Sequence, residues 1–164
     1  MSRVNPEACG DFQKSAHALI LDMELEAARR GRLFAFSRTI LEELKRAGIQ
    51  TAIITRNCEQ AVRIVFPDLE DHCCGFLSRD HVPQVKPDPD HLLRALRLIA
   101  VEPGSALMVG DHPIDIQTGI RAGVMTAGVC SGNASHKDLV ESGAHWTARD
   151  CCQLVMELKS LDLI

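Results

Sequence analysis

Apolar and polar residues follow two different periods along this chain. Between residues 51 and 129, short apolar runs alternate with longer stretches in which apolar residues recur every three or four positions. The short runs are typical of buried strands, and the longer stretches are typical of amphipathic helices. Strands that alternate with helices pair in parallel, because the chain must cross a face of the sheet between them. The pattern therefore predicts an α/β fold, a parallel sheet with helices on both faces.

Turn-forming residues bound most of these runs and divide the chain into elements. No linker or internal repeat interrupts the series. The predicted strands are 51–54, 75–77, 106–109, 125–129 and 145–147, and the predicted helices are 14–30, 37–47, 59–65, 88–99, 114–122, 135–142 and 150–158.

The segment from Met108 to Gly123 runs from an apolar strand through a Gly-Asp turn into a helix. It places Asp111 at the carboxyl end of the strand, where open α/β sheets bind their ligands, and Asp115 near the amino end of the helix. Carboxylates are hard oxygen ligands of the kind that suit Mg²⁺. An ordinary turn with Asp115 as a helix cap explains the same residues, so this segment alone leaves both interpretations open.

Thr55 follows an apolar run that begins at Ile49 and is itself followed by Arg56 and Asn57. Its hydroxyl group and the backbone N–H groups after it are suited to hold phosphate oxygens. A threonine at the end of a strand also occurs in plain turns, and taken alone that is the more frequent reason for it.

Lys86 lies in the string Val85-Lys-Pro-Asp-Pro-Asp90, directly before a predicted helix. The two prolines stiffen the approach to the helix and fix where the lysine points, which would make it an anion clamp. Most lysines are solvated surface charges, but few of them stand in such a rigid context. Asp88 and Asp90 are interpreted as helix caps rather than as catalytic carboxylates.

In chain order, Thr55, Lys86 and the pair Asp111 and Asp115 resemble the second, third and fourth motifs of the haloacid dehalogenase superfamily. The Lys-Pro-x-Pro and Gly-Asp-x-x-x-Asp strings are most similar to its phosphoglycolate phosphatase-like branch, and the resemblance covers roughly residues 33–146. It implies a Rossmann-like parallel sheet, in agreement with the pattern of apolar residues.

The resemblance also implies a reaction, Mg²⁺-dependent hydrolysis of small phosphate esters through an aspartyl-phosphate intermediate. Thr55 would bind the phosphoryl group, and Lys86 would neutralise charge on the nucleophile and the phosphate. Asp111 would ligate the metal, and Asp115 would be a catalytic residue that supports the metal shell or its waters. The substrate-binding residues implied in this way are Thr55, Arg56, Asn57 and Lys86.

The first motif of the family does not occur here in its expected form. That motif is an apolar strand followed by Asp-x-Asp-Gly-Thr, which supplies the nucleophile and the general acid, and no such string occurs here. The nearest candidate would use Asp22 as the nucleophile and Glu24 as the acid. Leu19 and Met23 recur at helical spacing around them, so a helix is favoured over a catalytic strand.

In phosphoglycolate phosphatase-like proteins, a helix of this kind ends the helical cap and leads into the core. We therefore expect residues 1–32 to be an N-terminal helical lead-in, a remnant of such a cap, and residues 33–164 to be the core domain.

The first-motif strand of the family lies between the strands of motifs two and four. A chain without it must pair those two strands directly, borrow a strand, or recruit residues 18–21. An unfilled position would leave backbone groups unsatisfied, at about 1–3 kcal/mol for each buried group. The resemblance therefore predicts marginal stability or self-association.

The composition narrows the class of partner. A formal net charge of −4 and the absence of a basic run argue against nucleic acid. No apolar run approaches the length of a membrane span, and no export signal is visible, so we expect a cytoplasmic protein without a membrane partner. The expected partner is a small phosphorylated metabolite, attracted by Lys86 and the metal.

Two functions remain open at this point. The first is a haloacid dehalogenase-like phosphatase, in which Asp22 and Glu24 would have to replace the missing motif. The second is a catalytically inactive phosphate- or Mg²⁺-binding remnant, or a subunit that lacks the nucleophile and needs a partner. A receiver-type signalling domain fits less well, because its acidic residues should come early in the chain, whereas here Lys86 precedes Asp111.

Overall fold

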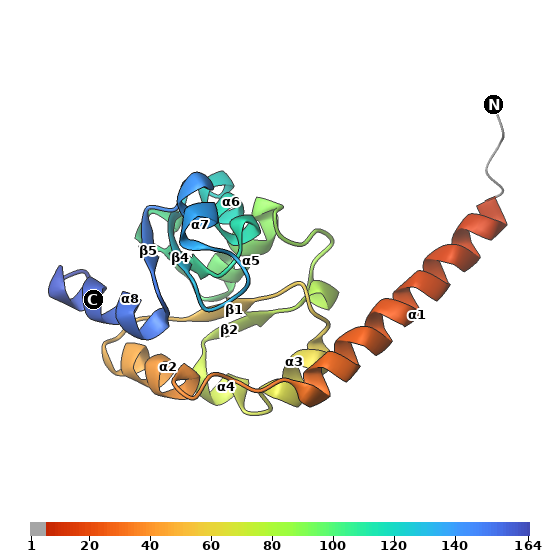
Figure 1. Cartoon of the computed structure of the whole chain (residues 1–164), viewed down its shortest axis with the longest axis horizontal. Coiled ribbons are helices and arrows are strands. Elements are labelled where there is room, and N and C mark those ends of the chain that lie inside the picture. The colour runs from red at the N-terminus through yellow and green to blue at the C-terminus, as the bar shows by residue number, and fades with distance from the viewer. Residues whose placement is uncertain (1–5) are drawn as a thin grey trace.

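The computed structural model describes the chain from residue 6 to residue 164, and the side chains of residue 12 and of residues 14–164 (Figure 1). Five strands lie in this part of the chain. They are β1 (Ala52–Ile54), β2 (Gly75–Leu77), β3 (Leu107–Gly110), β4 (Met125–Val129) and β5 (Trp146–Ala148).

Helices precede the first strand and separate each strand from the next. The α-helices are α1 (Pro6–Arg30), α2 (Ser37–Arg46), α3 (Glu59–Val65), α4 (Leu69–His72), α5 (Pro89–Leu98), α6 (Pro113–Arg121), α7 (His136–Glu141) and α8 (Cys151–Ser160), and the 3₁₀ turns are η1 (Arg79–His81) and η2 (Pro103–Ser105).

The strands form two parallel sheets rather than one. β1 pairs with β2, and β3, β4 and β5 form a second sheet in that order. The register places Ile53 beside Phe76 in the first sheet and Val109 beside Ala127 in the second. Each pair is joined through a helix, as parallel pairing requires.

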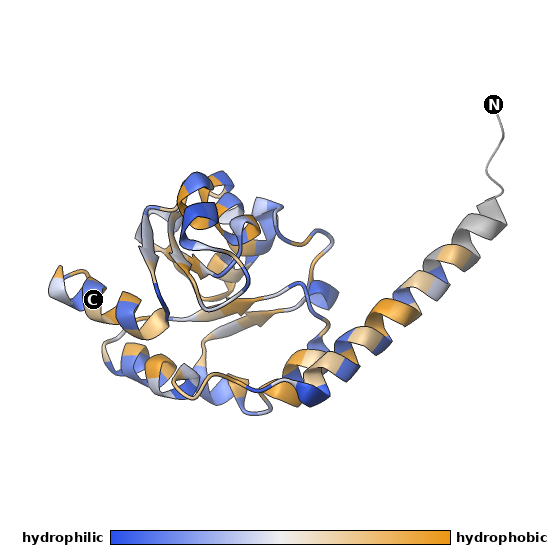
Figure 2. Ribbon diagram, in the orientation of Figure 1, coloured by the Kyte–Doolittle hydropathy of each residue, from blue (hydrophilic) through white to orange (hydrophobic). Residues whose placement is uncertain are grey.

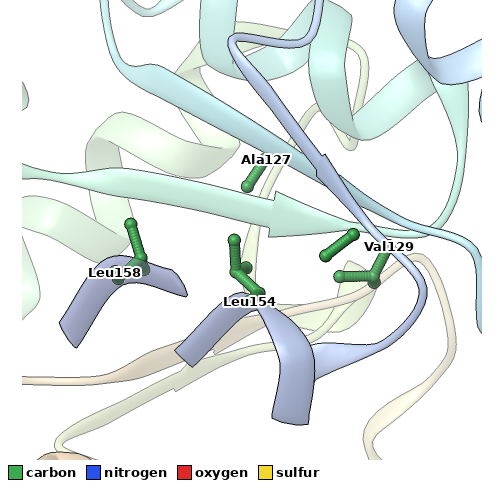
Figure 3. Packing of buried hydrophobic residues seen from close by; sticks show 5 residues of the cluster. Ala127, Val129, Leu154 and Leu158 are labelled. Atoms are coloured by element: carbon green, nitrogen blue, oxygen red, sulfur yellow. The ribbon is translucent and has the colours of Figure 1, made fainter. Parts of the chain in front are cut away.

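Side chains alternate across β4 and cover both faces of the larger sheet. Ala127 and Val129 pack on Leu154 and Leu158 of α8, as Figure 3 shows. The other face carries Gly128, which lies so close to α7 that an added Cβ would be 2.9 Å from the Cβ of Leu139. Burial of a valine or leucine side chain such as these stabilises the fold by about 1.5–3 kcal/mol.

Helix α5 holds the two sheets together on one face. Its buried Leu92 and Leu96 pack with Met108 of β3, and Ile54 of β1 packs against the same cluster. Because this cluster contains residues from both sheets, neither sheet can move away without exposing apolar surface.

The structure confirms the α/β class and the type of every predicted element. The strands 75–77 and 125–129 and the helix 59–65 have the predicted bounds, and most other bounds differ by one or two residues. The first helix begins at Pro6 instead of residue 14, and the short helix α4 was not predicted. The lead-in of residues 1–32 and the core of residues 33–164 remain a prediction.

Of the three alternatives for the central position of the sheet, two do not occur in residues 6–164. β1 and β3 do not pair with each other, and residues 18–21 are helical, as the spacing of the apolar residues favoured. Apolar residues at helical spacing outweigh the local resemblance to a strand, because Leu21 and Leu25 pack against α3. Between residues 6 and 164, β1 and β3 therefore each have one edge without a strand partner.

Helix α1 leaves the body as a long arm (Figure 1). Its last turns pack on α3, where Leu25 and Ala28 form a buried cluster with Cys58 and Ala61. The arm carries apolar residues in solvent (Figure 2), and Leu19 is 61% exposed. No helix in residues 6–164 combines the length and the apolar character that a membrane span needs.

Unpaired strand edges and the exposed apolar arm predict a marginally stable or self-associating protein. We expect light scattering after size-exclusion chromatography to show a mass that rises with protein concentration, or thermal unfolding below the range of about 45–65 °C usual for such domains. A strict monomer that unfolds cooperatively within that range would contradict this prediction.

Candidate functional site

A cavity of about 660 Å³ lies between the two sheets and the end of α1. Ile53 and Thr55 line it from β1, and Val109 and Asp111 line it from β3. Because both strands contribute residues at their carboxyl ends, the cavity opens where parallel sheets bind their ligands. The rest of the lining is mainly apolar and includes Glu24, Ala27, Ala28, Phe36, Ile40, Ala61, Val129, Ser131 and Cys151.

Thr55 is half-buried and makes the turn at the end of β1. Its Oγ1 atom accepts a hydrogen bond of 3.1 Å from the backbone N–H of Asn57, and its own N–H donates to the carbonyl oxygen of Leu77. Asn57 also lines the cavity, whereas Arg56 is exposed and does not. The hydroxyl group thus has a turn partner and still borders the cavity.

Lys86 and Asp115 form an ion pair, with 2.7 Å between Nζ and Oδ1. The two side chains are only 13% and 8% exposed. An ion pair with so little solvent is costly to break, since removing one partner leaves an uncompensated buried charge. Lys86 is therefore directed by the protein, as its stiff context predicted, but its charge is already balanced by Asp115.

Asp115 has a second role at the start of α6. Its Oδ2 atom accepts a hydrogen bond from the backbone N–H of His112, while His112 Nδ1 accepts one from Ile114 N–H. This capping box satisfies backbone donors at the helix end. The alternative interpretation of Asp115 as a cap is thus part of its role, and the solvent-exposed His112 is the N-cap residue of the helix.

Gly110 makes the contact between β3 and Asp115 possible. A Cβ atom at this position would lie 2.2 Å from the Cβ of Asp115. Any other residue would therefore push α6 away from the strand, or push the carboxylate away from Lys86.

Asp111 is exposed and lies against the loop that follows β4. Its carboxylate approaches the backbone of Gly132 so closely that a Cβ there would be 2.1 Å from Oδ2. Asp111 thus presents a carboxylate at the cavity without an ion-pair partner among the described residues. The same part of the chain contains no group of three or more His, Cys, Asp or Glu residues placed to hold a metal ion.

His91 supports the segment that carries Lys86. It is fully buried in α5, its Nδ1 lies 3.4 Å from the backbone nitrogen of Lys86, and its Nε2 lies 3.1 Å from the carbonyl oxygen of Leu77. Burial lowers the pKa of His91, so the ring stays neutral and can accept at one nitrogen while it donates at the other.

Asp22 and Glu24 do not form a catalytic pair. Asp22 is exposed on α1, and Glu24 accepts a hydrogen bond of 3.0 Å from Cys58 N–H and forms an ion pair with Arg79. Glu24 therefore fixes α1 to the start of α3, and the helical interpretation of this segment is confirmed. Cys58 is buried and packs with Leu25 and Ala28 of α1.

The predicted site residues form two groups. Lys86 and Asp115 make direct contact, while Thr55, Asn57 and Asp111 line the cavity and form no hydrogen bond or ion pair with those two side chains among the described residues. Ser131 and Cys151 also line the cavity and were not predicted. Ser131 follows β4 and carries the same sequence signal as Thr55, a polar residue after an apolar run. Nothing in the sequence marks Cys151 as a cavity residue or His91 as the support of the Lys86 segment.

Comparison with protein families gives a match over residues 13–129, to the haloacid dehalogenase-like hydrolases. Among curated proteins, the pyrophosphatase PpaX of Bacillus cereus is 38% identical over 91 residues. That match covers 54% of this chain and 42% of the relative, so it spans less than half the length of the relative.

Solved structures agree on the fold. A hydrolase from Pseudomonas syringae is similar with a TM-score of 0.77 and 23% identity, over 98% of this chain and 72% of that one. A predicted phosphoglycolate phosphatase from Haemophilus somnus is similar with a TM-score of 0.69 and 23% identity, over 77% of this chain and 57% of that one. At these identities the likeness concerns the fold.

Replacement of Gly110 should disturb the site by overpacking. We expect Gly110→Ala to lower the free energy of unfolding by about 1–3 kcal/mol, because the new methyl group collides with the Asp115 side chain. Gly104→Ala is the matched control, since an added Cβ there meets nothing within 4 Å, and it should stay within about 0.5 kcal/mol of the wild type. Urea unfolding measures both, and equal effects of the two substitutions would refute the assignment of this contact.

Proposed function

Because the chain belongs to the haloacid dehalogenase-like hydrolase family, we propose that it carries the phosphate-binding half of a phosphatase site for small phosphate esters. The supporting observations are that Thr55 and Asp111 line one cavity at the carboxyl ends of β1 and β3, and that Lys86 forms an ion pair with Asp115 of the helix that follows β3. Hydrolysis through an aspartyl-phosphate would then need a carboxylate nucleophile from outside the described residues.

Each residue has a chemical task in this proposal. Thr55 Oγ and the N–H groups of the turn after it bind phosphoryl oxygens, with Asn57 at the cavity wall and Arg56 in solvent nearby. Lys86 supplies a directed ammonium group that stabilises negative charge on the phosphoryl group. Asp115 keeps that ammonium in place through their ion pair, and this is how it contributes to catalysis.

The site offers the type of ligand that Mg²⁺ prefers, but the described residues offer too few such ligands to hold the ion alone. Asp111 offers an exposed carboxylate oxygen, the ligand that Mg²⁺ prefers. Asp115 is engaged by Lys86 and His112, so it is better placed to order water around a metal than to bind the metal itself. When bound, Mg²⁺ would supply neutralisation of phosphate charge, and the remaining ligands would be water and groups from outside the described residues.

A binding function without catalysis is the second candidate. The observation that favours it is the position of Asp22, which is exposed on a helix and not among the residues that line the cavity. Without a nucleophile, Thr55 and Lys86 can bind and polarise a phosphate but cannot form a covalent intermediate. The two candidates share a binding site and differ in turnover.

The metal proposal predicts weak binding centred on Asp111. Millimolar Mg²⁺ should shift backbone amide resonances between Gly110 and Asp115, and the shifts should disappear in Asp111→Asn. Asp22→Asn is the matched control, because Asp22 is an exposed carboxylate outside the cavity and its loss should leave the shifts unchanged. Tight micromolar binding, or shifts that survive Asp111→Asn, would place the metal elsewhere.

The catalytic proposal predicts that turnover depends on an added nucleophile. The chain should hydrolyse neither p-nitrophenyl phosphate nor phosphoglycolate above background with Mg²⁺ present. Fusion of an apolar strand followed by Asp-x-Asp-Gly-Thr upstream of residue 1 should produce turnover, and the same fusion with Asn in place of both Asp residues should not. Colorimetric phosphate release measures all three proteins.

Two outcomes would change the assignment. In the first, the unmodified chain turns over substrate and loses this activity in both Asp22→Asn and Lys86→Ala while both variants stay folded. That result would make Asp22 the nucleophile and would contradict the proposal that the nucleophile comes from outside the described residues. If the fused chain binds phosphate, loses this binding in Lys86→Ala and yet shows no turnover, the binding function without catalysis is the correct one.

A further inference from the structure

The loop between β4 and α7 lies directly beside the carboxylate of Asp111. A Cβ atom built on Gly132 of this loop would lie 2.1 Å from Oδ2 of Asp111, 2.7 Å from its Cγ and 3.0 Å from its Cβ. Non-bonded carbon atoms pack best at about 3.5–4.0 Å. With Asp111 in its present rotamer, the position beside its carboxylate therefore has room for a glycine and for no larger residue.

The Asp111 carboxylate has no polar partner among the residues that the structure describes. Asp115 differs in this respect, because its two oxygens are bonded to Lys86 and to the backbone N–H of His112. A carboxylate without such bonds is free to sample the staggered rotamers about its Cα–Cβ bond. The close approach of the Gly132 backbone is therefore the contact that limits the direction of Asp111.

Both ends of this loop are anchored by hydrogen bonds. At the β4 end, the N–H of Cys130 donates to the carbonyl oxygen of Ala148 over 3.0 Å. At the α7 end, the N–H of Ser135 donates to Oδ2 of Asp138 over 2.9 Å, and the Ser135 side chain caps the helix. A loop held at both ends moves little when a methyl group is added within it. The aspartate side chain beside it has no bond to lose, so it is the part that moves.

The backbone conformation does not require a glycine at position 132. Gly123 and Gly143 have φ angles of 71° and 88°, in the region that favours glycine, whereas Gly132 is not among the residues with positive φ. Alanine can therefore adopt the same backbone conformation, and the methyl group is the only change that it brings. The preference for glycine at this position comes from the neighbouring Asp111 side chain.

We propose that Gly132 is a positioning residue, which holds the carboxylate of Asp111 in one rotamer at the edge of the cavity. The carboxylate is then directed before a cation arrives, so less conformational freedom is lost on binding. The consequence for Mg²⁺ rests on the proposed function. The effect on the Asp111 rotamer does not, because it follows from the contact alone.

The Asp111 rotamer is measured on the full chain without metal, from the three-bond couplings of its Cγ to the backbone nitrogen and carbonyl carbon. We expect the couplings of a single rotamer in the wild type and different couplings in Gly132→Ala, because the methyl group excludes the present position of Cγ. Asn133→Ala is the matched control, since Asn133 is an exposed neighbour in the same loop, and its couplings should equal those of the wild type.

Three results of this measurement would overturn the proposal. The first is averaged couplings for Asp111 in the wild type. The second is wild-type couplings in a folded Gly132→Ala chain. The third is a Gly132→Ala chain that does not fold, because the proposal requires the Asp111 side chain to move while the loop stays in place. Backbone amide spectra show whether each variant is folded.

Titration with magnesium chloride measures the consequence for binding. Gly132→Ala should raise the Kd for Mg²⁺ at Asp111 by about tenfold, because the apparent affinity falls with the fraction of chains whose carboxylate is in the binding rotamer. Asn133→Ala should leave the Kd unchanged. A wild-type Kd in Gly132→Ala, despite a changed rotamer, would overturn the positioning role. If the wild type gives no Mg²⁺ response that depends on Asp111, the proposed metal site fails, and the couplings still decide the role of Gly132.

Discussion

The apolar layer between α5 and the strands is the interaction on which the rest of this structure depends. Leu92, Leu96 and Met108, with Ile54 against them, join two sheets that share no hydrogen bond between strands in the described residues. In a continuous sheet, backbone ladders set the spacing of neighbouring strands. Here side-chain packing sets the spacing of the two sheets. The position of Thr55 relative to Asp111 therefore depends on how α5 packs on both of them.

The site adds a polar requirement to this apolar one. Lys86 reaches Asp115 only because Gly110 lets α6 approach β3, and because His91 holds the backbone of the Lys86 segment against the end of β2. The ion pair itself joins two segments that are 29 residues apart in the sequence. The direction of the Lys86 ammonium group therefore depends on how α6 packs on β3 and on how α5 packs against the end of β2. A change in either contact would alter it.

The type of nearly every element could be predicted from the sequence, because local periodicity and turn residues determine whether a short segment forms a helix or a strand. The helical state of Asp22 and Glu24 followed from the same signal. The division into two sheets could not be predicted in this way, since it depends on which strands meet in space. The sequence also did not reveal that Asp115 balances the charge of Lys86, or that His91 bonds to the end of β2. Both are contacts between separate elements.

The low exposure of the Lys86 and Asp115 pair has a consequence for how ionic strength acts on this site. Mobile ions screen charges in solvent over roughly 8 Å at physiological salt, but they reach a buried pair poorly. An anion that approaches Lys86 meets an ammonium group that is shared with a carboxylate, and neither charge is much weakened by added salt. Attraction at this position is therefore short in range and largely insensitive to salt, so recognition depends on close fit rather than on steering from a distance.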